Sequence, residues 1–151
     1  MESITAIDGS VLDFVHVQDA DTVSILSFVG TVYNQRSRIR YIKELNTNLS
    51  AVRDSNPHLW FIQKRGEKGY VGMVVFGTSE DYAVSIEVCI SPKWRLNGYG
   101  RAAVVAAAEL LSGLSDDHYF CVAKGLHDEF CRGLGMDDAP TCWAMKVREL
   151  L

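Results

Sequence analysis

Hydrophobic and polar positions alternate most regularly between residues 82 and 90. In the run YAVSIEVCI every second residue from Tyr82 to Ile90 is apolar or aromatic, whereas the residues between them include Glu87 and Cys89. A strand places successive side chains on opposite faces, so this run is predicted to be a strand with one apolar face and one small or polar face.

Other short runs rich in β-branched and aromatic residues, bounded by turn residues, also predict strands. The runs HLWFIQK and YVGMVVFGTS are separated only by RGEKG, which predicts a hairpin. Together with residues 82–90 this gives about six strands, the others covering residues 11–17, 58–64, 70–79, 118–123 and 141–150.

Apolar residues at helical spacing predict four helices. The first begins after the acidic stretch at Asp19, the second covers residues 34–53, and the fourth covers residues 126–134 and ends at Gly135. The third, over residues 100–114, is rich in alanine and is expected to bury one stripe of side chains: Ala103, Ala107, Leu110, Leu111 and Leu114.

The predicted elements follow the order β-α-α-β-β-β-α-β-α-β. This order favours an α+β (mixed α/β) fold with a central, mostly antiparallel sheet and helices on both faces. A chain of 151 residues has the length of one domain, so residues 1–151 are predicted to form a single domain.

Composition and charge exclude several classes of protein. The formal net charge is -4, which disfavours nonspecific binding to nucleic acid. The first ten residues, MESITAIDGS, lack the basic segment of a signal peptide, and no apolar run is long enough to span a membrane. The four cysteines form no C-x-x-C pair, so neither a metal site nor a disulfide framework is expected. The predicted location is the cytoplasm.

The segment SPKWRLNGYG, residues 91–100, joins the predicted strand to the alanine-rich helix. Gly98 and Gly100 allow another group to approach the backbone, and the start of the helix presents unpaired N–H groups. With Lys93 and Arg101 beside it, this segment is predicted to bind a phosphate group. The alternative is that the glycines only shape a turn and the cations are solvated.

A dinucleotide site is the first rival, because G98-Y-G-R-A-A103 matches the fingerprint G-x-G-x-x-[GA]. That fingerprint requires a tight turn directly after a strand and an acidic residue at the end of the next strand. Seven residues separate Ile90 from Gly98, and the strand HYFCVA ends without an acid. Both departures disfavour a nucleotide-binding oxidoreductase.

The same segment resembles the signature of the GNAT superfamily of N-acetyltransferases, [QR]-x-x-G-x-[GA] after a strand that ends in V-x-P. This chain reads I90-S-P92-K-W-R95-L-N-G98-Y-G100, and the predicted order of elements is similar to the whole GNAT fold. The resemblance implies an acyltransferase that uses acetyl-CoA as acyl donor and transfers the acetyl group directly to an amine acceptor.

The resemblance also implies which residues bind the cofactor. The pantetheine arm would pair with the edge of the strand near Cys89 and Ile90, and the pyrophosphate would lie on the backbone N–H groups of the loop. The implied loop residues are Arg95, Leu96, Asn97, Gly98, Tyr99, Gly100 and Arg101.

A second family motif, N-x-x-A-x-x-x-Y-x-x-x-G-F, is altered in this chain. Lys124 stands at the asparagine, His127 at the alanine, and Cys131 at the tyrosine that commonly protonates the departing thiolate. Cys131 is therefore one candidate for the acid and Tyr119 a second, with packing roles as the alternative for both. His127 and Cys131 share a helix face, but two such residues without a third make a weak metal site.

An alkyl ammonium has a pKa of about 10.4, so an amine acceptor is protonated at neutral pH and must lose a proton before it attacks. Glu87 is the first candidate for the base, since it lies on the polar face of the strand that should carry the thioester. A solvated strand glutamate is the alternative, and Asp81 and Glu80 are weaker candidates.

Arg36 and Arg38 lie between the first two predicted helices, where the GNAT family shapes its acceptor pocket. If they bind substrate, the acceptor carries a carboxylate or phosphate beside its amine. The alternative is a solvated helix face. A monomer or homodimer is expected, and the second function to weigh is a GNAT-fold protein that has lost catalysis and serves as a binding or structural module.

Overall fold

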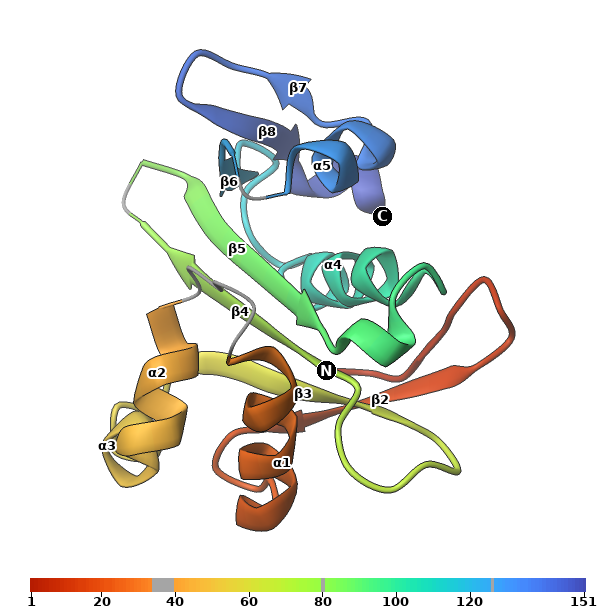
Figure 1. The fold of residues 1–151 in the computed structure, drawn as a ribbon. Helices are drawn as coiled ribbons and strands as arrows, with labels where there is room; N and C mark the ends of the chain where they lie inside the picture. Colours follow the sequence, from red (N-terminus) through yellow and green to blue (C-terminus); the bar gives the residue numbers. More distant parts are fainter. Residues whose placement is uncertain (34–39, 80, 126) are drawn as a thin grey trace.

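The computed structural model describes residues 1–33, 40–79, 81–125 and 127–151. One sheet runs through the molecule in the order β1-β2-β3-β4-β5-β6-β8-β7, and helices lie against both of its faces (Figure 1). The strands are β1 Ile4–Thr5, β2 Val11–His16, β3 His58–Lys64, β4 Gly72–Thr78, β5 Ala83–Ile90, β6 Tyr119–Ala123, β7 Asp137–Asp138 and β8 Cys142–Lys146.

Helices cover the sheet from both sides, and two short 3₁₀ turns follow strands β5 and β8. Among the described residues the α-helices are α1 Thr22–Val32, α2 Arg40–Thr47, α3 Leu49–Asp54, α4 Tyr99–Leu110 and α5 Asp128–Leu134. The 3₁₀ turns are η1 Pro92–Trp94 and η2 Val147–Leu150. No helix in the described part of the chain is long and apolar enough to cross a membrane.

The predicted fold class, a mixed α/β fold with a mostly antiparallel sheet, is confirmed. The sheet has eight strands rather than six, because β1 and β7 are only two residues long and show no alternation in the sequence. Within the predicted helix over residues 34–53, α2 and α3 are separate helices that meet at Asn48, and residues 34–39 lie outside the described part.

Neighbouring strands pair antiparallel except β5 and β6. The parallel pairing of β5 with β6 covers three residue pairs and ends where Ser85 lies opposite Cys121. β5 continues for five more residues, to Ile90, beside β4 alone. The edge of β5 that faces β6 is therefore unpaired over the half of the strand that leads into residues 91–98.

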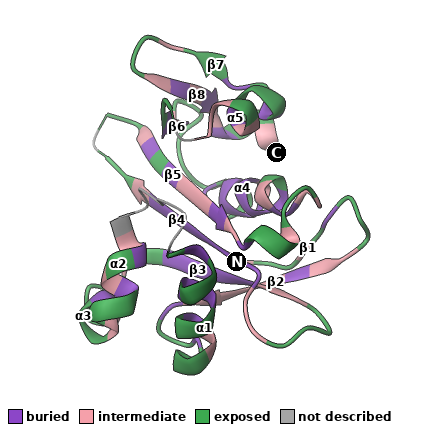
Figure 2. Ribbon diagram, in the orientation of Figure 1, coloured by how far each residue is buried: buried purple, intermediate pink, exposed green. Residues whose placement is uncertain are grey.

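Two hydrophobic cores lie on the two faces of the sheet. One lies between the sheet and helices α4 and α5, and the other between the sheet and helices α1 to α3, as the buried positions in Figure 2 show. The alternation predicted for β5 is confirmed, since Val84 and Ile86 belong to the first core and Cys89 to the second.

Helix α4 packs closely on the sheet through its alanines. Ala103 and Ala107 are fully buried, as predicted. The predicted stripe is wrong at its C-terminal end, where Leu110 is 46% and Leu114 38% exposed. Leu111 is buried as predicted, whereas Leu110 closes the helix on its exposed side and Leu114 lies beyond the helix end, where the helical period no longer holds.

Candidate functional site

The loop between β5 and α4 is held in place by hydrogen bonds at both of its ends. The backbone N–H of Ser91 donates to the carbonyl of Val71 over 2.8 Å. The hydroxyl of Ser91, a buried polar side chain, donates to Thr31 Oγ1 on α1 over 3.1 Å. At the other end the amide of Asn97 donates to the carbonyl of Trp94 over 3.1 Å. These hydrogen bonds fix the loop to β4 and α1 at one end and brace it internally at the other.

The N-terminus of α4 points out of this loop. Gly98 precedes the helix in the left-handed conformation, with φ of 79°, which favours glycine. The first N–H groups of a helix have no carbonyl partner within it, and they form the positive end of its dipole. Arg101 lies exposed on this first turn. The loop and the helix together present backbone donors and positive charge, which suits an anion.

Gly100 has a second role that the sequence did not indicate. A Cβ atom on Gly100 would lie 3.0 Å from Cε2 of Phe130, which lies on α5. The absence of a side chain at this position therefore lets α4 and α5 approach each other. Close approach was predicted for Gly100, and the group that approaches in this structure is an aromatic ring.

Cationic side chains gather around the loop. The Nζ atoms of Lys64 and Lys93 lie 4.8 and 5.0 Å from the centre of the Trp94 ring. Arg95 folds back along the loop, and its Nε donates to the carbonyl of Ile90 over 3.0 Å. This contact places the Arg95 guanidinium at the end of β5.

Two of the predicted cofactor residues have contrasting side chains. The Tyr99 side chain is 1% exposed, and its hydroxyl donates to Asp8 Oδ2 over 2.8 Å and contacts Ser10 Oγ at 3.1 Å. Only the backbone of Tyr99 can face a ligand at the loop. The Leu96 side chain, in contrast, is fully exposed on a residue with φ of 66°.

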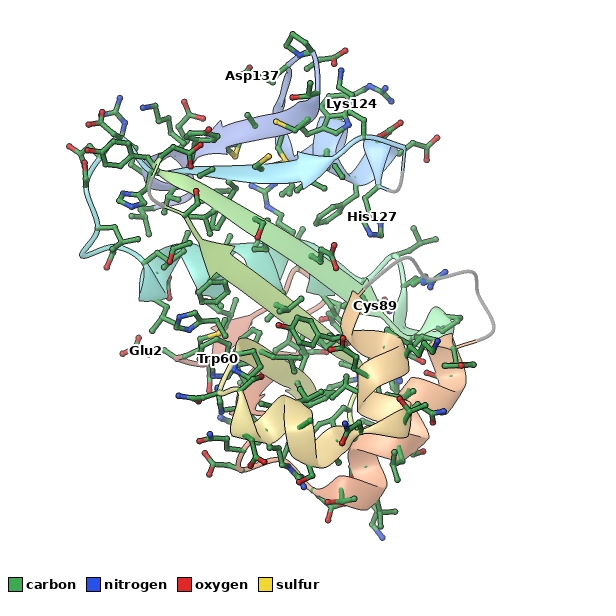
Figure 3. The ribbon with its side chains drawn as sticks, turned by 90° about the vertical axis from the view of Figure 1, so that its left-hand side faces the viewer. Glu2, Trp60, Cys89, Lys124, His127 and Asp137 are labelled. Carbon is green, nitrogen blue, oxygen red and sulfur yellow. The ribbon has the colours of Figure 1, made fainter. Side chains whose placement is uncertain are left out.

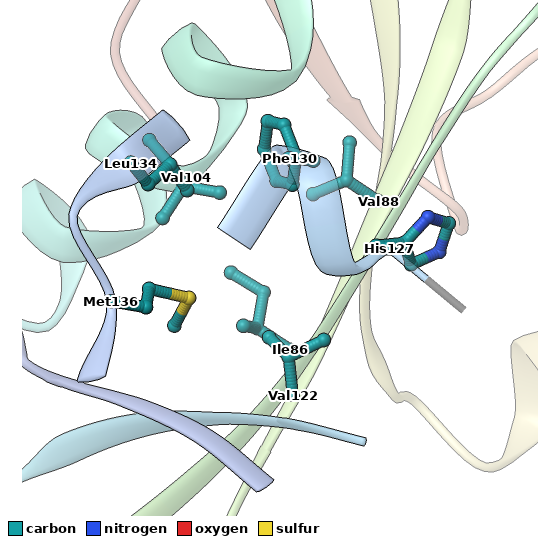
Figure 4. A pocket seen from close by; sticks show the side chains of 8 residues that line it. All are labelled: Ile86, Val88, Val104, Val122, His127, Phe130, Leu134 and Met136. Carbon is teal, nitrogen blue, oxygen red and sulfur yellow. The ribbon is translucent and has the colours of Figure 1, made fainter. Parts of the chain in front are cut away.

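An apolar pocket lies where β5 and β6 diverge, under helices α4 and α5 (Figure 4). It was missed from the sequence because its lining comes from four separate segments of the chain. The only signal was the apolar face of residues 82–90, which supplies two of the lining residues. The lining residues are Ile86, Val88, Val104, Val122, His127, Phe130, Leu134 and Met136.

His127 is the polar side chain of this pocket. It immediately precedes α5 and is half-buried. Burial lowers the pKa of His127, and the positive charge of Arg95 lowers it further, which favours the neutral imidazole. Figure 3 labels His127 on the side of the molecule where α5 begins. Among the described residues no group of three His, Cys, Asp or Glu side chains could hold a metal ion.

Glu87 is half-buried on the face of β5 opposite the pocket. It lies across from Val75 of β4, and in the described part of the chain its carboxylate forms no hydrogen bond or ion pair. Burial raises the pKa of Glu87. Its neighbour on the same face, Cys89, is 8% exposed, and burial raises the pKa of that thiol to about 11. Glu87 is therefore the group here that can accept a proton, and Cys89 stays a thiol.

The two candidates for the acid do not lie beside Glu87. Cys131 is fully buried in the core on the other face of the sheet, and burial raises the pKa of its thiol to about 11. Tyr119 pairs with Ala83 at the far end of β5 from the loop. These positions favour packing for both residues, the alternative that the sequence left open.

The remaining predicted residues are at or beyond the limits of the described part. Arg36, Arg38 and Glu80 lie outside the described residues. Asp81 is exposed. Several hydrogen bonds lower the pKa of its carboxyl, and the bond from the Ser79 hydroxyl has the largest effect. An exposed carboxyl with a lowered pKa is a weaker base than Glu87.

No protein-family model and no curated protein matches this sequence. Solved structures do match its fold. A ribosomal-protein-S5-alanine acetyltransferase from Vibrio fischeri is 10% identical, with a TM-score of 0.70 and coverage of 100% of both chains. A GNAT family acetyltransferase from Brucella melitensis, in complex with acetyl-CoA, is 13% identical, with a TM-score of 0.63 and coverage of 89% of this chain and 87% of the other.

A third structure shares the fold over a similar length. A dodecameric spermidine N-acetyltransferase from Vibrio cholerae is 10% identical, with a TM-score of 0.68 and coverage of 93% of this chain and 96% of the other. The TM-scores establish a common fold. Because the sequence identities are this low, the site residues of this chain have to be judged on their own geometry.

Proposed function

Because the chain has the fold of the GNAT acetyltransferases, we propose that it is an acyl-CoA-dependent N-acyltransferase. It would transfer acetyl from acetyl-CoA directly to a primary amine of a small molecule or protein. One observation carries the proposal: the unpaired edge of β5 runs directly into a glycine loop and the N-terminus of a twelve-residue helix. An extended arm and a phosphate group at its end require these two surfaces side by side.

The chain offers donors for each part of the cofactor. Backbone N–H groups of residues 95–101 would hold the pyrophosphate, and Lys93 and Arg101 would add positive charge. The free edge of β5 from Ile86 to Ile90 would pair with the amides of the pantetheine arm. When bound, acetyl-CoA supplies the activated acyl group.

Glu87 is the residue that we assign to proton removal from the amine. Its raised pKa makes it a better base than an exposed carboxylate, and no described partner holds the carboxylate away from a substrate. An N–H on the free edge of β5 would stabilise the negative charge that develops on the carbonyl oxygen. Arg36 and Arg38 stay candidates for binding the acceptor.

A second function is favoured by the altered second motif. Cys131 stands where a tyrosine would supply a proton, and it is fully buried. A protein that binds the cofactor but does not turn it over, acting as a binding or structural module, would also have the loop and the free edge of β5. Turnover separates the two functions, whereas cofactor binding does not.

Calorimetric titration with acetyl-CoA, with NADH as the control ligand, tests the cofactor site. We expect saturable binding of acetyl-CoA alone, and a loss of affinity of at least about 100-fold in Gly100→Glu, because the carboxylate enters the anion site. Gly113→Glu is the matched control, since a Cβ atom there meets nothing within 4 Å.

Gly100→Gln separates charge from size, since either side chain must displace the Phe130 ring. Unfolding temperatures of all three variants show whether the fold survives the substitution. Absence of acetyl-CoA binding to the unsubstituted protein would contradict the proposal. Binding without acetylation of any amine in a panel of polyamines, amino acids and peptide N-termini would favour the binding module.

A further inference from the structure

The half of the sheet formed by β6 and β8 has one face that no described helix covers. Phe120 and Val122 of β6, and Trp143 and Met145 of β8, are buried in the core beneath α4 and α5. Side chains alternate along a strand, so the residues between them point to the opposite face. Figure 3 views this face, and helices α1 to α3 lie in front of the lower part of the sheet only.

Two cysteines lie together on this open face. Cys121 is opposite Ala144 and Cys142 is opposite Ala123, so the two cysteines are diagonal neighbours on adjacent antiparallel strands. Burial raises the pKa of the Cys121 thiol to about 11, and the nearby Cys142 thiol contributes to the rise. Both are free and half-buried, whereas Cys89 and Cys131 are buried. The residues directly across from both cysteines are alanines, which leave room above the thiols.

We propose that Cys121 and Cys142 form a binding site for a soft monovalent metal ion, Cu(I), held between their two sulfur atoms. The site lies outside the loop and the pocket described above, and it does not depend on the proposed acyltransferase function. Thiolate ligands select soft metals such as Cu(I), and two thiolates satisfy Cu(I) in a linear arrangement.

The register favours a bridging metal over a disulfide bond. Diagonal neighbours on an antiparallel pair lie about 7–8 Å apart, beyond the roughly 4.4–6.8 Å between the Cα atoms of a usual disulfide. Two metal–sulfur bonds of about 2.3 Å each place the sulfurs farther apart than one sulfur–sulfur bond does. Thiols on the same face of adjacent strands, at diagonal positions, can turn toward each other and accept an ion between them.

The number of ligands favours Cu(I) over Zn(II). Zinc sites in proteins take four ligands, of which at least three come from the protein. No third His, Cys, Asp or Glu completes a cluster with these two thiols in the described part of the chain. Binding of Cu(I) leaves its oxidation state unchanged: each thiol releases one proton to solvent, two copper–sulfur bonds form, and the complex carries one negative charge.

The test is an anaerobic titration of the whole reduced protein with Cu(I) in competition with a chromogenic Cu(I) chelator. We expect one ion per chain, and an affinity at least about 100-fold lower in Cys121→Ser and in Cys142→Ser, because each removes one of two ligands. Cys131→Ala is the matched control, which removes a thiol from the core and should bind as the unsubstituted protein does.

Unfolding temperatures confirm that each variant is folded, and both serine substitutions are at half-buried positions that tolerate a polar group. Wild-type affinity in either serine variant would overturn the proposal, since one thiol would then suffice. Zn(II) binding as tight as Cu(I) binding would also overturn it. So would the loss of two titratable thiols, with a mass decrease of two hydrogens, on treatment with a hydroperoxide when no Cu(I) is bound.

Discussion

Glu87 is a carboxylate whose charge the fold does not compensate. It is half-buried on a strand, its pKa is raised by burial, and no described partner offsets the loss of solvation. The proposed base is thereby also a source of instability. A group that only solubilised the strand would face water and would have an ordinary pKa.

We expect Glu87→Gln to lower kcat/KM for amine acetylation by about 10²–10⁴-fold, while the Kd for acetyl-CoA stays the same. Steady-state kinetics and calorimetry measure the two quantities. Glu109→Gln, an exposed position on α4, is the control for loss of a negative charge. A variant that keeps its turnover would remove Glu87 from the mechanism.

The same substitution should stabilise the protein at neutral pH. Because the folded-state pKa lies above the ordinary value, the unsubstituted protein loses stability as pH rises from the ordinary pKa through the raised one. We expect Glu87→Gln to unfold at a higher temperature at pH 7, and the difference to vanish below about pH 4, where both side chains are neutral. An equal difference at both pH values would place the effect outside ionisation.

Alternation in the sequence placed Glu87 on the polar face of its strand, because a period of two is local, and the resemblance to the GNAT family made it the candidate base. The sequence could not predict the proximity of Cys121 and Cys142, or the Phe130 ring at Gly100, since both depend on which segments lie side by side. The sequence singled out His127 as a departure from a motif and as a helix-face neighbour of Cys131, and it did not place His127 in an apolar pocket. The register and helix packing give these residues their neighbours.

At the scale of elements, β4 and β5 hold the loop in place through close backbone contact at Gly72. This glycine pairs with Ile90, the last residue of β5. A Cβ atom there would lie 2.8 Å from the carbonyl oxygen of Cys89 and 2.7 Å from Cδ1 of Ile90. A backbone atom at that distance cannot rotate away, so the strands themselves would have to separate.

Gly72→Ala should therefore destabilise the protein by about 1–3 kcal/mol, which lowers the unfolding temperature by roughly 3–10 °C. Gly77→Ala, in the same strand, is the control, because the nearest atom to its Cβ is Ser85 Oγ at 3.4 Å. Calorimetric unfolding of both variants checks the prediction. Equal unfolding temperatures of the Gly72→Ala and Gly77→Ala variants would show that β4 and β5 can separate near Gly72 at little cost in free energy.

The sequence predicted best those elements in which the repeat of apolar positions, every two residues in a strand or every three to four in a helix, occurs several times. β5, with eight residues, and α4, with twelve, were predicted within a few residues, whereas β1 and β7 were not. The separation of α2 from α3 was also missed, since Asn48 adopts a non-helical φ of -152° between two segments of continuous helical pattern. A two-residue strand or a one-residue break leaves no period to detect.

At the scale of the whole molecule, a net charge of -4 opposes the binding of an anion. The positive side chains at the loop attract an anion locally, against the repulsion from the net negative charge of the molecule. Salt screens both the attraction and the repulsion. Ligand that binds only the folded state stabilises it, by about 2.7 kcal/mol at a concentration of 100 Kd.

We expect saturating acetyl-CoA to raise the unfolding temperature by roughly 5–10 °C. The rise should shrink between about 0.05 and 0.5 M salt, because the local attraction between cations and phosphates is screened. Thermal scans at several salt concentrations measure this. A rise that grows with salt would indicate that repulsion of acetyl-CoA by the net negative charge outweighs its attraction to the cations at the loop.

The short parallel junction has a mechanical consequence. The sheet consists of two antiparallel blocks, β1 to β5 and β6 with β8 and β7, joined by three residue pairs at one end of β5. Beyond these three pairs the two blocks diverge, and side chains of both blocks pack in the core beneath α4 and α5. A ligand that contacted both blocks where they diverge would add a second connection between them. Part of the rigidity of the complete protein would then come from its ligand.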